Sequence, residues 1–152
     1  MRLHITVTTL LCLSLCVLAC GEDSHPGGNA RSDQQLLQGT WKMVRLMKNG
    51  VDEDVVKHPA TLTITAKDIT ETRSGNSIQT GTYALDPSAN PKRITMVATT
   101  GDNAGKTFEG IYEVDGTTLK LAYSFGDHAA TPPKDFSGGE GTGLLVLERE
   151  RS

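Results

Sequence analysis

Residues 107–125 read TFEGIYEVDGTTLKLAYSF, and this stretch decides the fold. On both sides of Asp115-Gly116, apolar and polar side chains alternate with the period of two that is typical of a half-buried β-strand. The Asp-Gly pair is a strong signal for a two-residue hairpin turn. We therefore expect two antiparallel strands, 107–114 and 117–125. Their shared apolar faces contain Phe108, Tyr112, Val114, Leu119, Leu121 and Tyr123.

Six further segments have the length and residue types of strands and are bounded by turn residues. They are 39–47, 60–66, 68–73, 78–85, 93–99 and 143–150. Even spacing of short strands favours an antiparallel sandwich or an up-and-down barrel. Ahead of them, Ser32 and Gln35 match a capping box, which predicts a single helical turn. Residues 51–58 fit a short helix or an irregular strand. The eight strand segments and the capping box together predict an all-β fold with eight strands and a short N-terminal helical turn.

The composition fits one globular domain. The chain has 152 residues, a typical length for a single domain. Fifteen Lys and Arg residues against 18 Asp and Glu residues give a net charge of −3, so no basic surplus is available to neutralise phosphates, and we expect no nucleic-acid partner. With 16 Gly but one Trp, three Tyr and three Phe, we expect many turns and a light core.

The first 19 residues have the features of an export signal. Arg2 supplies a positive charge, and the apolar stretch that follows is too short to span a bilayer. Val17-Leu18-Ala19-Cys20 then resembles the bacterial lipobox. This resemblance implies that Cys20 receives a diacylglyceryl group, that the signal is cut before it, and that the new N-terminus is acylated. The alternative is ordinary secretion, with Cys20 as a spare thiol.

The cysteine positions agree with lipidation. Cys12 and Cys16 lie inside the signal (1–19), so Cys20 is the sole cysteine of the predicted mature chain and no intrachain disulfide is expected. Residues 20–31 are polar and Gly-rich, as in a flexible tether, and 32–152 form the expected barrel domain. We predict an exported, membrane-anchored lipoprotein of the periplasm or cell envelope, monomeric, whose partner is the membrane bound through the lipid.

Four ordered segments resemble a small-domain family that is abundant in planctomycete bacteria. Members of that family are mostly uncharacterised and are similar to lipocalins. The resemblance covers roughly 33–149 and implies an up-and-down lipocalin-like barrel and an exported setting, but no activity. The segments that carry it are LQGTWK (37–42), GTYALDP (81–87) with NPK (90–92), GIYEVDG (110–116) with Leu119, and LLVLE (144–148).

Gly39-Thr40-Trp41 resembles the Gly-x-Trp motif of the first lipocalin strand. In that fold the Trp plugs the closed end of the barrel, and a basic residue of the last strand packs over it. The resemblance therefore implies a structural role for Trp41, with Arg149 as its cationic partner and Arg151 as the next candidate.

Residues that would carry catalysis or metal binding are not recognisable. Residues 101–107 (GDNAGKT) imitate a nucleotide-binding P-loop, but three residues separate the glycines where that loop needs four, so a hairpin loop is the better interpretation. His58 and His128 lack partners at metal-ligand spacing. There is no Gly-x-Ser-x-Gly nucleophile elbow. We predict that the protein is not an enzyme and has no cofactor and no metal site.

An eight-stranded barrel either fills its interior with side chains or holds one small ligand, and the sequence leaves both open. The candidate ligand-binding residues of the interior are Trp41, Arg45, Tyr83, Tyr112 and Tyr123. Arg45 is included because it shares strand parity with Trp41; the alternatives are a strand bulge or a side chain that reaches out to water. Residues 126–142 are long enough to be a lid over the barrel or a strap along it, with Phe136 as an anchor.

Two functions fit these expectations. The first is binding of a small apolar or amphipathic molecule by a membrane-anchored lipocalin-like barrel. The second is an interaction or structural module of the cell envelope, such as an inhibitor of an exported enzyme, whose barrel is packed shut. The binder requires an apolar cavity with one open mouth, whereas the interaction module requires a large exposed apolar patch.

Overall fold

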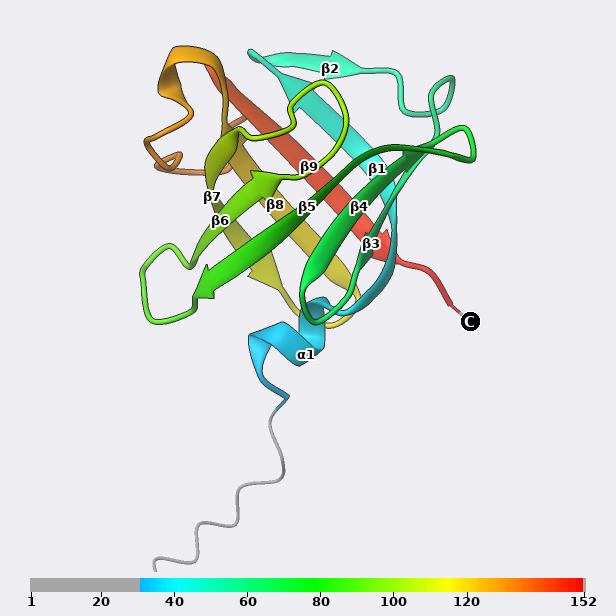
Figure 1. The fold of residues 1–152 in the computed structure, drawn as a ribbon, viewed down its shortest axis with the longest axis horizontal. Coiled ribbons are helices and arrows are strands. Elements are labelled where there is room, and N and C mark those ends of the chain that lie inside the picture. Colours follow the sequence, from blue (N-terminus) through cyan, green and yellow to red (C-terminus); the bar gives the residue numbers. More distant parts are fainter. Residues whose placement is uncertain (1–30, 152) are drawn as a thin grey trace, which may run out of the picture. The chain divides into compact units, whose positions relative to one another are not determined.

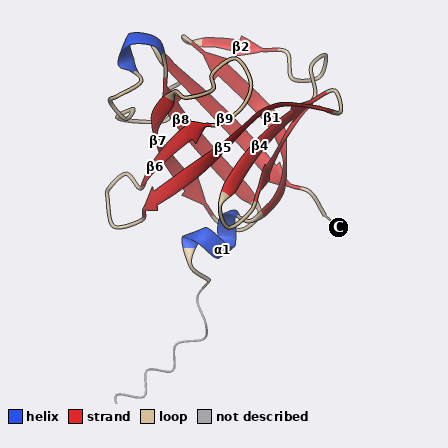
Figure 2. Ribbon diagram, viewed as in Figure 1, coloured by secondary structure: helices blue, strands red, loops and turns tan. Residues whose placement is uncertain are grey.

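The computed structural model describes residues 31–151, which form a barrel of antiparallel strands preceded by one short helix (Figures 1 and 2). The helix α1 spans Asp33–Leu37, and a 3₁₀ turn spans Gly126–His128. No helix among these residues is long and apolar enough to cross a membrane. The strands are β1 (Gly39–Lys48), β2 (Val51–Glu53), β3 (Ala60–Ile64), β4 (Asp68–Arg73), β5 (Asn76–Asp86), β6 (Arg93–Ala98), β7 (Thr107–Val114), β8 (Thr118–Ser124) and β9 (Thr142–Arg149).

The sheet closes on itself. Strand β1 pairs with β3, each strand from β3 onward pairs antiparallel with the next, and β9 returns to pair with β1. These eight strands form the barrel, while the three-residue β2 pairs only with the end of β1. The predicted all-β, eight-stranded antiparallel barrel with a short N-terminal helical turn is thus confirmed. Each barrel strand is followed by its neighbour in an up-and-down arrangement, so the first strand, β1, and the last, β9, become adjacent and pair.

Helix α1 lies across one end of the barrel, which we call the closed end (Figure 1). The capping box is formed as predicted: the Ser32 hydroxyl accepts from the Gln35 N–H at 3.3 Å, and the Gln35 side chain accepts from the Ser32 N–H at 3.0 Å. The indole of Trp41 donates to the Leu37 carbonyl at 2.7 Å, which fixes the end of α1 over the barrel. Leu37 itself is 1% exposed and belongs to the core.

The core is densest at the closed end. Trp41, Tyr112 and Leu147 are fully buried, and Leu119 is almost fully buried beside them. All come from the inward-facing positions of β1, β7, β9 and β8, so the alternation read from the sequence places them together. Residues 31–151 hold nine strands and two apolar clusters, one inside the barrel and one on its outer face.

The structure shows the conformation of two segments for which the sequence left alternatives open. Residues 51–58 form the short strand β2 and a following turn, not a helix. Residues 126–142 begin at the barrel rim with the 3₁₀ turn, and Phe136 then packs on the outer face of the barrel against Ile111, Ala122 and Leu144. The segment containing Phe136 is therefore a strap along the outside of the barrel.

Candidate functional site

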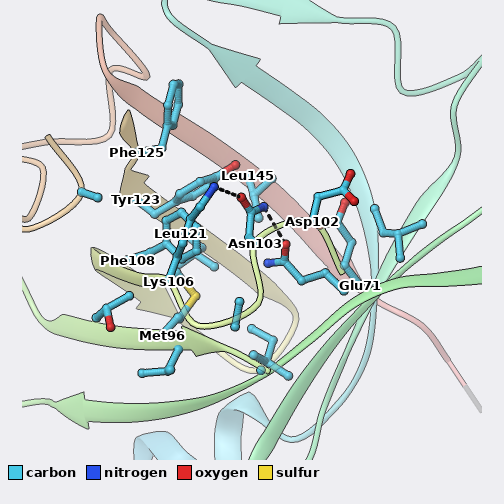
Figure 3. Close-up of a pocket in the computed structure, with 18 of the residues that line it drawn as sticks. Glu71, Met96, Asp102, Asn103, Lys106, Phe108, Leu121, Tyr123, Phe125 and Leu145 are labelled. Atoms are coloured by element: carbon cyan, nitrogen blue, oxygen red, sulfur yellow. Dashed lines mark hydrogen bonds between the residues drawn. The ribbon is translucent and has the colours of Figure 1, made fainter. Parts of the chain in front are cut away.

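The end of the barrel opposite α1 holds a cavity of about 770 Å³ (Figure 3). Pockets for small molecules usually measure 300–1,000 Å³, so this volume is sufficient for one ligand. The interior is therefore not packed shut. We call the solvent-facing opening the mouth; it is bordered by the β4–β5 turn, the β6–β7 loop and the start of the 126–142 segment.

The floor of the cavity is apolar. The inward-facing residues of β8 run from the closed end to the mouth. Leu119 belongs to the packed closed end, and Leu121, two residues on, lines the cavity. Tyr123 and then Phe125 follow toward the mouth. Residues on the same face of neighbouring strands occupy the same levels because the ladders run in register. The side chains that line the floor with Leu121 are Leu46, Leu62, Ile69, Met96, Phe108 and Leu145.

An ion pair lines the cavity above the floor. Glu71 and Arg73 lie on β4, two residues apart, and the Arg73 Nε donates to the Glu71 carboxylate at 2.8 Å. The side chain of Arg73 is 33% exposed and that of Glu71 is 22% exposed, so both are partly withdrawn from water. A charge in such a position needs a charged or hydrogen-bonding partner, and each residue supplies one to the other.

The β6–β7 loop brings polar side chains to the mouth. The Asn103 amide donates to the Gln79 side chain at 2.8 Å, and the Lys106 ammonium donates to the Asn103 amide oxygen at 3.1 Å (Figure 3). Backbone hydrogen bonds from Ala98 to Lys106 and from Gly105 to Ala98 close the base of the loop. The P-loop-like residues 101–107 are thus a hairpin connection that leads into β7, as predicted, and they border the cavity.

Tyr123 forms the aromatic wall of the cavity. Its ring meets Phe108 edge-to-face, with centroids 6.1 Å apart, and Phe125 lies on its other side at the same distance. Gly143 pairs with Tyr123 on β9, and a Cβ there would lie 2.7 Å from the ring, so only glycine leaves room for it. Burial, together with the charge of Glu71, raises the pKa of Tyr123 to about 12, so the phenol keeps its proton at neutral pH.

Of the five interior residues named from the sequence, only Tyr123 lines the cavity. Trp41 and Tyr112 lie in the packed closed end. Tyr83 donates its hydroxyl to the Thr65 carbonyl at 2.7 Å, at the β3–β4 turn on the same closed side. These three aromatic residues stabilise the barrel and do not contact the cavity.

Arg45, a candidate interior residue, does not point into the barrel; of the alternatives that the sequence left open, the structure shows the strand bulge. The β1–β9 register shifts between Met43 and Arg45, which is a β-bulge, so that the next inward residue is Leu46. A bulge inserts one extra residue and reverses the alternation that follows it. Arg45 therefore lies on the outer surface, where its guanidinium pairs with Asp52 of β2 at 2.7 Å.

The closed end has the arrangement implied by the Gly-x-Trp motif. The Arg149 guanidinium lies 4.1 Å from the centroid of the Trp41 ring. It also donates to three backbone carbonyls that no strand uses, at Leu36, Gln38 and Gly116. One side chain thus ties the helix, the first strand and the β7–β8 turn together.

A second cluster attaches α1 to the barrel. The Asp33 carboxylate accepts from the Tyr112 hydroxyl and from the Lys92 ammonium, both at 2.7 Å. Burial alone would raise the pKa of Asp33, but the hydrogen bonds from Lys92 and Tyr112 outweigh it and hold that pKa below its ordinary value. Both clusters belong to the closed end, so their role is structural.

Sequence reasoning missed the polar residues of the cavity. Gln79 of β5 meets Asn103 and Lys106 of the β6–β7 loop across neighbouring hairpins, and no motif marks them. Arg73 and Glu71 share a face by parity with Ile69, which was the one available signal. Among the described residues, no group of three His, Cys, Asp or Glu side chains is placed to hold a metal ion. Cys20, the predicted lipidation site, lies outside them.

Comparison with known proteins adds no assignment. No protein-family model matches the chain. The search of curated proteins found no relative either.

Proposed function

We propose that the protein binds one small amphipathic molecule in the barrel cavity. The observation that carries the proposal is a cavity of about 770 Å³ with an apolar floor and a polar mouth. Such a site gains most from a ligand with an apolar body, because removing apolar surface from water contributes about 25 cal/mol per Å². The polar groups at the mouth then fix the orientation of the ligand.

The distribution of exposed apolar side chains supports binding over an interaction module. Only four large apolar residues of the described chain are substantially exposed: Val51, Val56, Ile78 and Val97. One of them, Ile78, borders the cavity at its mouth, whereas Val97 lies on the outer face of β6 between the inward-facing Met96 and Ala98. The exposed apolar side chains are scattered and form no patch that would mark a docking surface.

The proposed setting is the cell envelope. The export signal in 1–19 and the lipobox-like sequence ending at Cys20 support an exported lipoprotein held at a membrane by acyl chains. The tether 20–31 would then join the anchor to a ligand-binding barrel. In this proposal the molecule presents or stores a ligand at the membrane surface and performs no chemistry on it.

Native mass spectrometry of residues 31–152, purified from an exporting host, tests the binding proposal. We expect an adduct that disappears on denaturation, or, after delipidation, binding of an apolar fluorescent probe with a stoichiometry of one. A bare protein mass combined with no probe binding across a panel of amphiphiles would contradict it.

Labelling with radioactive palmitate in the exporting host tests the anchor. We expect label on the full-length chain and none on a Cys20→Ser variant. Equal labelling of both, or of neither with normal secretion, would favour ordinary export.

A further inference from the structure

The polar residues that line the cavity offer more donors than acceptors. Arg73 uses its Nε on Glu71, and its two Nη groups bond no other described residue. Lys106 bonds only a neutral amide oxygen, and Lys48 makes no ion pair within the described chain. All three cations line the same cavity. Their remaining N–H groups are available to a ligand.

Acceptors are scarcer. The two carboxylates that line the cavity are Glu71 and Asp102. Glu71 already accepts from Arg73, while Asp102 and Lys106 are both exposed in the β6–β7 loop. Three cations against two carboxylates leave one positive charge in excess at neutral pH. A partly enclosed site strengthens this excess, because charges there interact in a lower effective dielectric than in water.

Tyr123 adds a further donor. Its hydroxyl finds no hydrogen-bond partner in residues 31–151, yet the side chain lines the cavity between Phe108 and Phe125. Because the phenol is protonated at neutral pH, it can donate to a ligand oxygen. A phenol whose hydroxyl faces a cavity without a partner fits a site completed by an acceptor-rich ligand.

We propose that the ligand carries a carboxylate head group on a single apolar chain, and that it enters chain-first. The chain occupies the floor around Leu121 and Met96. The carboxylate accepts from the Nη groups of Arg73, whose planar fork matches two carboxylate oxygens. Lys106 and Tyr123 supply the neighbouring donors. This inference rests on the proposed binding function and names the chemical class of its ligand.

Three probes with the same twelve-carbon chain test the head-group preference on residues 31–152. They are dodecanoate, dodecan-1-ol and dodecyltrimethylammonium, each used below its micelle concentration at pH 8 in competition with an apolar fluorescent probe. We expect dodecanoate to bind about tenfold more tightly than dodecanol, since charge-assisted hydrogen bonds contribute more than neutral ones. The cationic probe should bind most weakly.

Arg73→Gln should lower dodecanoate affinity about tenfold and leave dodecanol affinity unchanged. The matched control is Arg45→Gln, which removes the same charge and also breaks an Arg–Asp pair, but on the outer surface. It should leave all three affinities unchanged. If Arg73→Gln fails to fold because Glu71 is left without its partner, the double variant with Glu71→Gln removes both charges and gives the same comparison.

The failure of this inference differs from the failure of the binding function. Equal affinities for the three probes, or a dodecanoate affinity that Arg73→Gln does not change, would overturn the carboxylate assignment while the cavity remains a binding site. Binding of none of the probes would overturn both. A preference for the cationic probe would show that Glu71, and not Arg73, faces the ligand.

Discussion

Arg149 is the residue that joins the most parts of the closed end. Its guanidinium lies over Trp41 and donates to carbonyls of Leu36, Gln38 and Gly116. A cation–π contact contributes about 0.5–2 kcal/mol, depending on how far the charge is removed from water. Hydrogen bonds to a charged donor contribute about 1.5–3 kcal/mol each and are not additive. A single substitution at this position therefore acts on the helix and on two connections at once.

Arg149→Gln should lower the free energy of unfolding by about 2–4 kcal/mol, because it removes the stacked cation and leaves carbonyls without donors. Urea denaturation followed by Trp41 fluorescence measures the change. The control is Arg151→Gln, two residues on, which removes the same charge from an exposed side chain. A loss below 0.5 kcal/mol for Arg149→Gln, or an equal loss for the control, would contradict a structural role for this guanidinium.

Ionisation of Asp33 makes the free energy of unfolding depend on pH under acidic conditions. Its pKa in the folded state lies below the ordinary value of 3.8, so the ionised form stabilises the fold. That contribution is complete well above pH 3.8 and is lost progressively as the pH falls through the folded-state pKa. The stability difference between the natural chain and Asp33→Asn should thus be constant between pH 5 and 7 and should shrink below pH 4.

Urea titrations from pH 2.5 to 7 measure this difference, with Asp127→Asn as a control at an exposed carboxylate. A difference that grows on acidification would mean that the Lys92 and Tyr112 hydrogen bonds do not outweigh burial.

At the scale of elements, β1 and the 126–142 segment show where strand patterns are insufficient. The bulge in β1 reverses its alternation. Before Val44 the inward-facing residues are odd-numbered, such as Met43, and after it they are even-numbered, such as Leu46. The strap has no repeating pattern, and Phe136 anchors it through an apolar cluster on the outer face of β7, β8 and β9. Lys120 lies 6.0 Å from the Phe136 ring centroid and covers the same cluster.

Phe136→Ala should release the strap without opening the cavity. We expect a loss of about 1–2 kcal/mol in the free energy of unfolding, as for a partly buried aromatic ring, and faster tryptic cleavage after Lys134. Affinity for the apolar probe should change less than twofold, because the cluster faces away from the interior. A loss of probe binding as large as that of Phe125→Ala at the rim would show instead that the strap acts as a lid.

At the scale of the whole molecule, the barrel is divided into a packed half and a hollow half. Helix α1, Trp41 and Arg149 occupy the first, and the cavity occupies the second. Leu119 and Leu121 mark the division, because they lie two residues apart on the same face of β8, at 1% and 2% exposure. Burial alone does not distinguish them; only the space in front of each side chain does.

Substitution of each leucine by Trp tests the division. Leu119→Trp should lower the free energy of unfolding by about 1–3 kcal/mol, since added atoms in a packed core force neighbouring side chains to move. Leu121→Trp should cost less than 1 kcal/mol and should abolish probe binding, because the indole fills the cavity. Denaturation and probe titration of both variants measure these effects. Equal destabilisation by the two substitutions would contradict an open cavity.

The features that depend on residues close together along the chain were predictable from the residue types alone. Strand alternation and the capping box at Ser32 are local consequences of backbone geometry, so their residue types predict them. The hairpin at Asp115-Gly116 was also marked locally, but its tight turn lies one residue further on, at Gly116-Thr117, because Val114 pairs with Leu119 and Asp115 bonds Thr118. The Trp41–Arg149 contact was available only through the resemblance of Gly-x-Trp to lipocalins.

The cavity in the barrel and the positions of its polar groups depend instead on contacts between strands. The bulge that turns Arg45 outward leaves no sequence signature, because it arises from pairing with β9. Glu71 faces Gln79 across the β4–β5 hairpin, but the Glu71–Arg73 pair shares a cavity with Tyr123 of β8 only once the eight strands close. Cavity volume depends on how side chains from all strands fill a common space, a quantity that no single strand encodes.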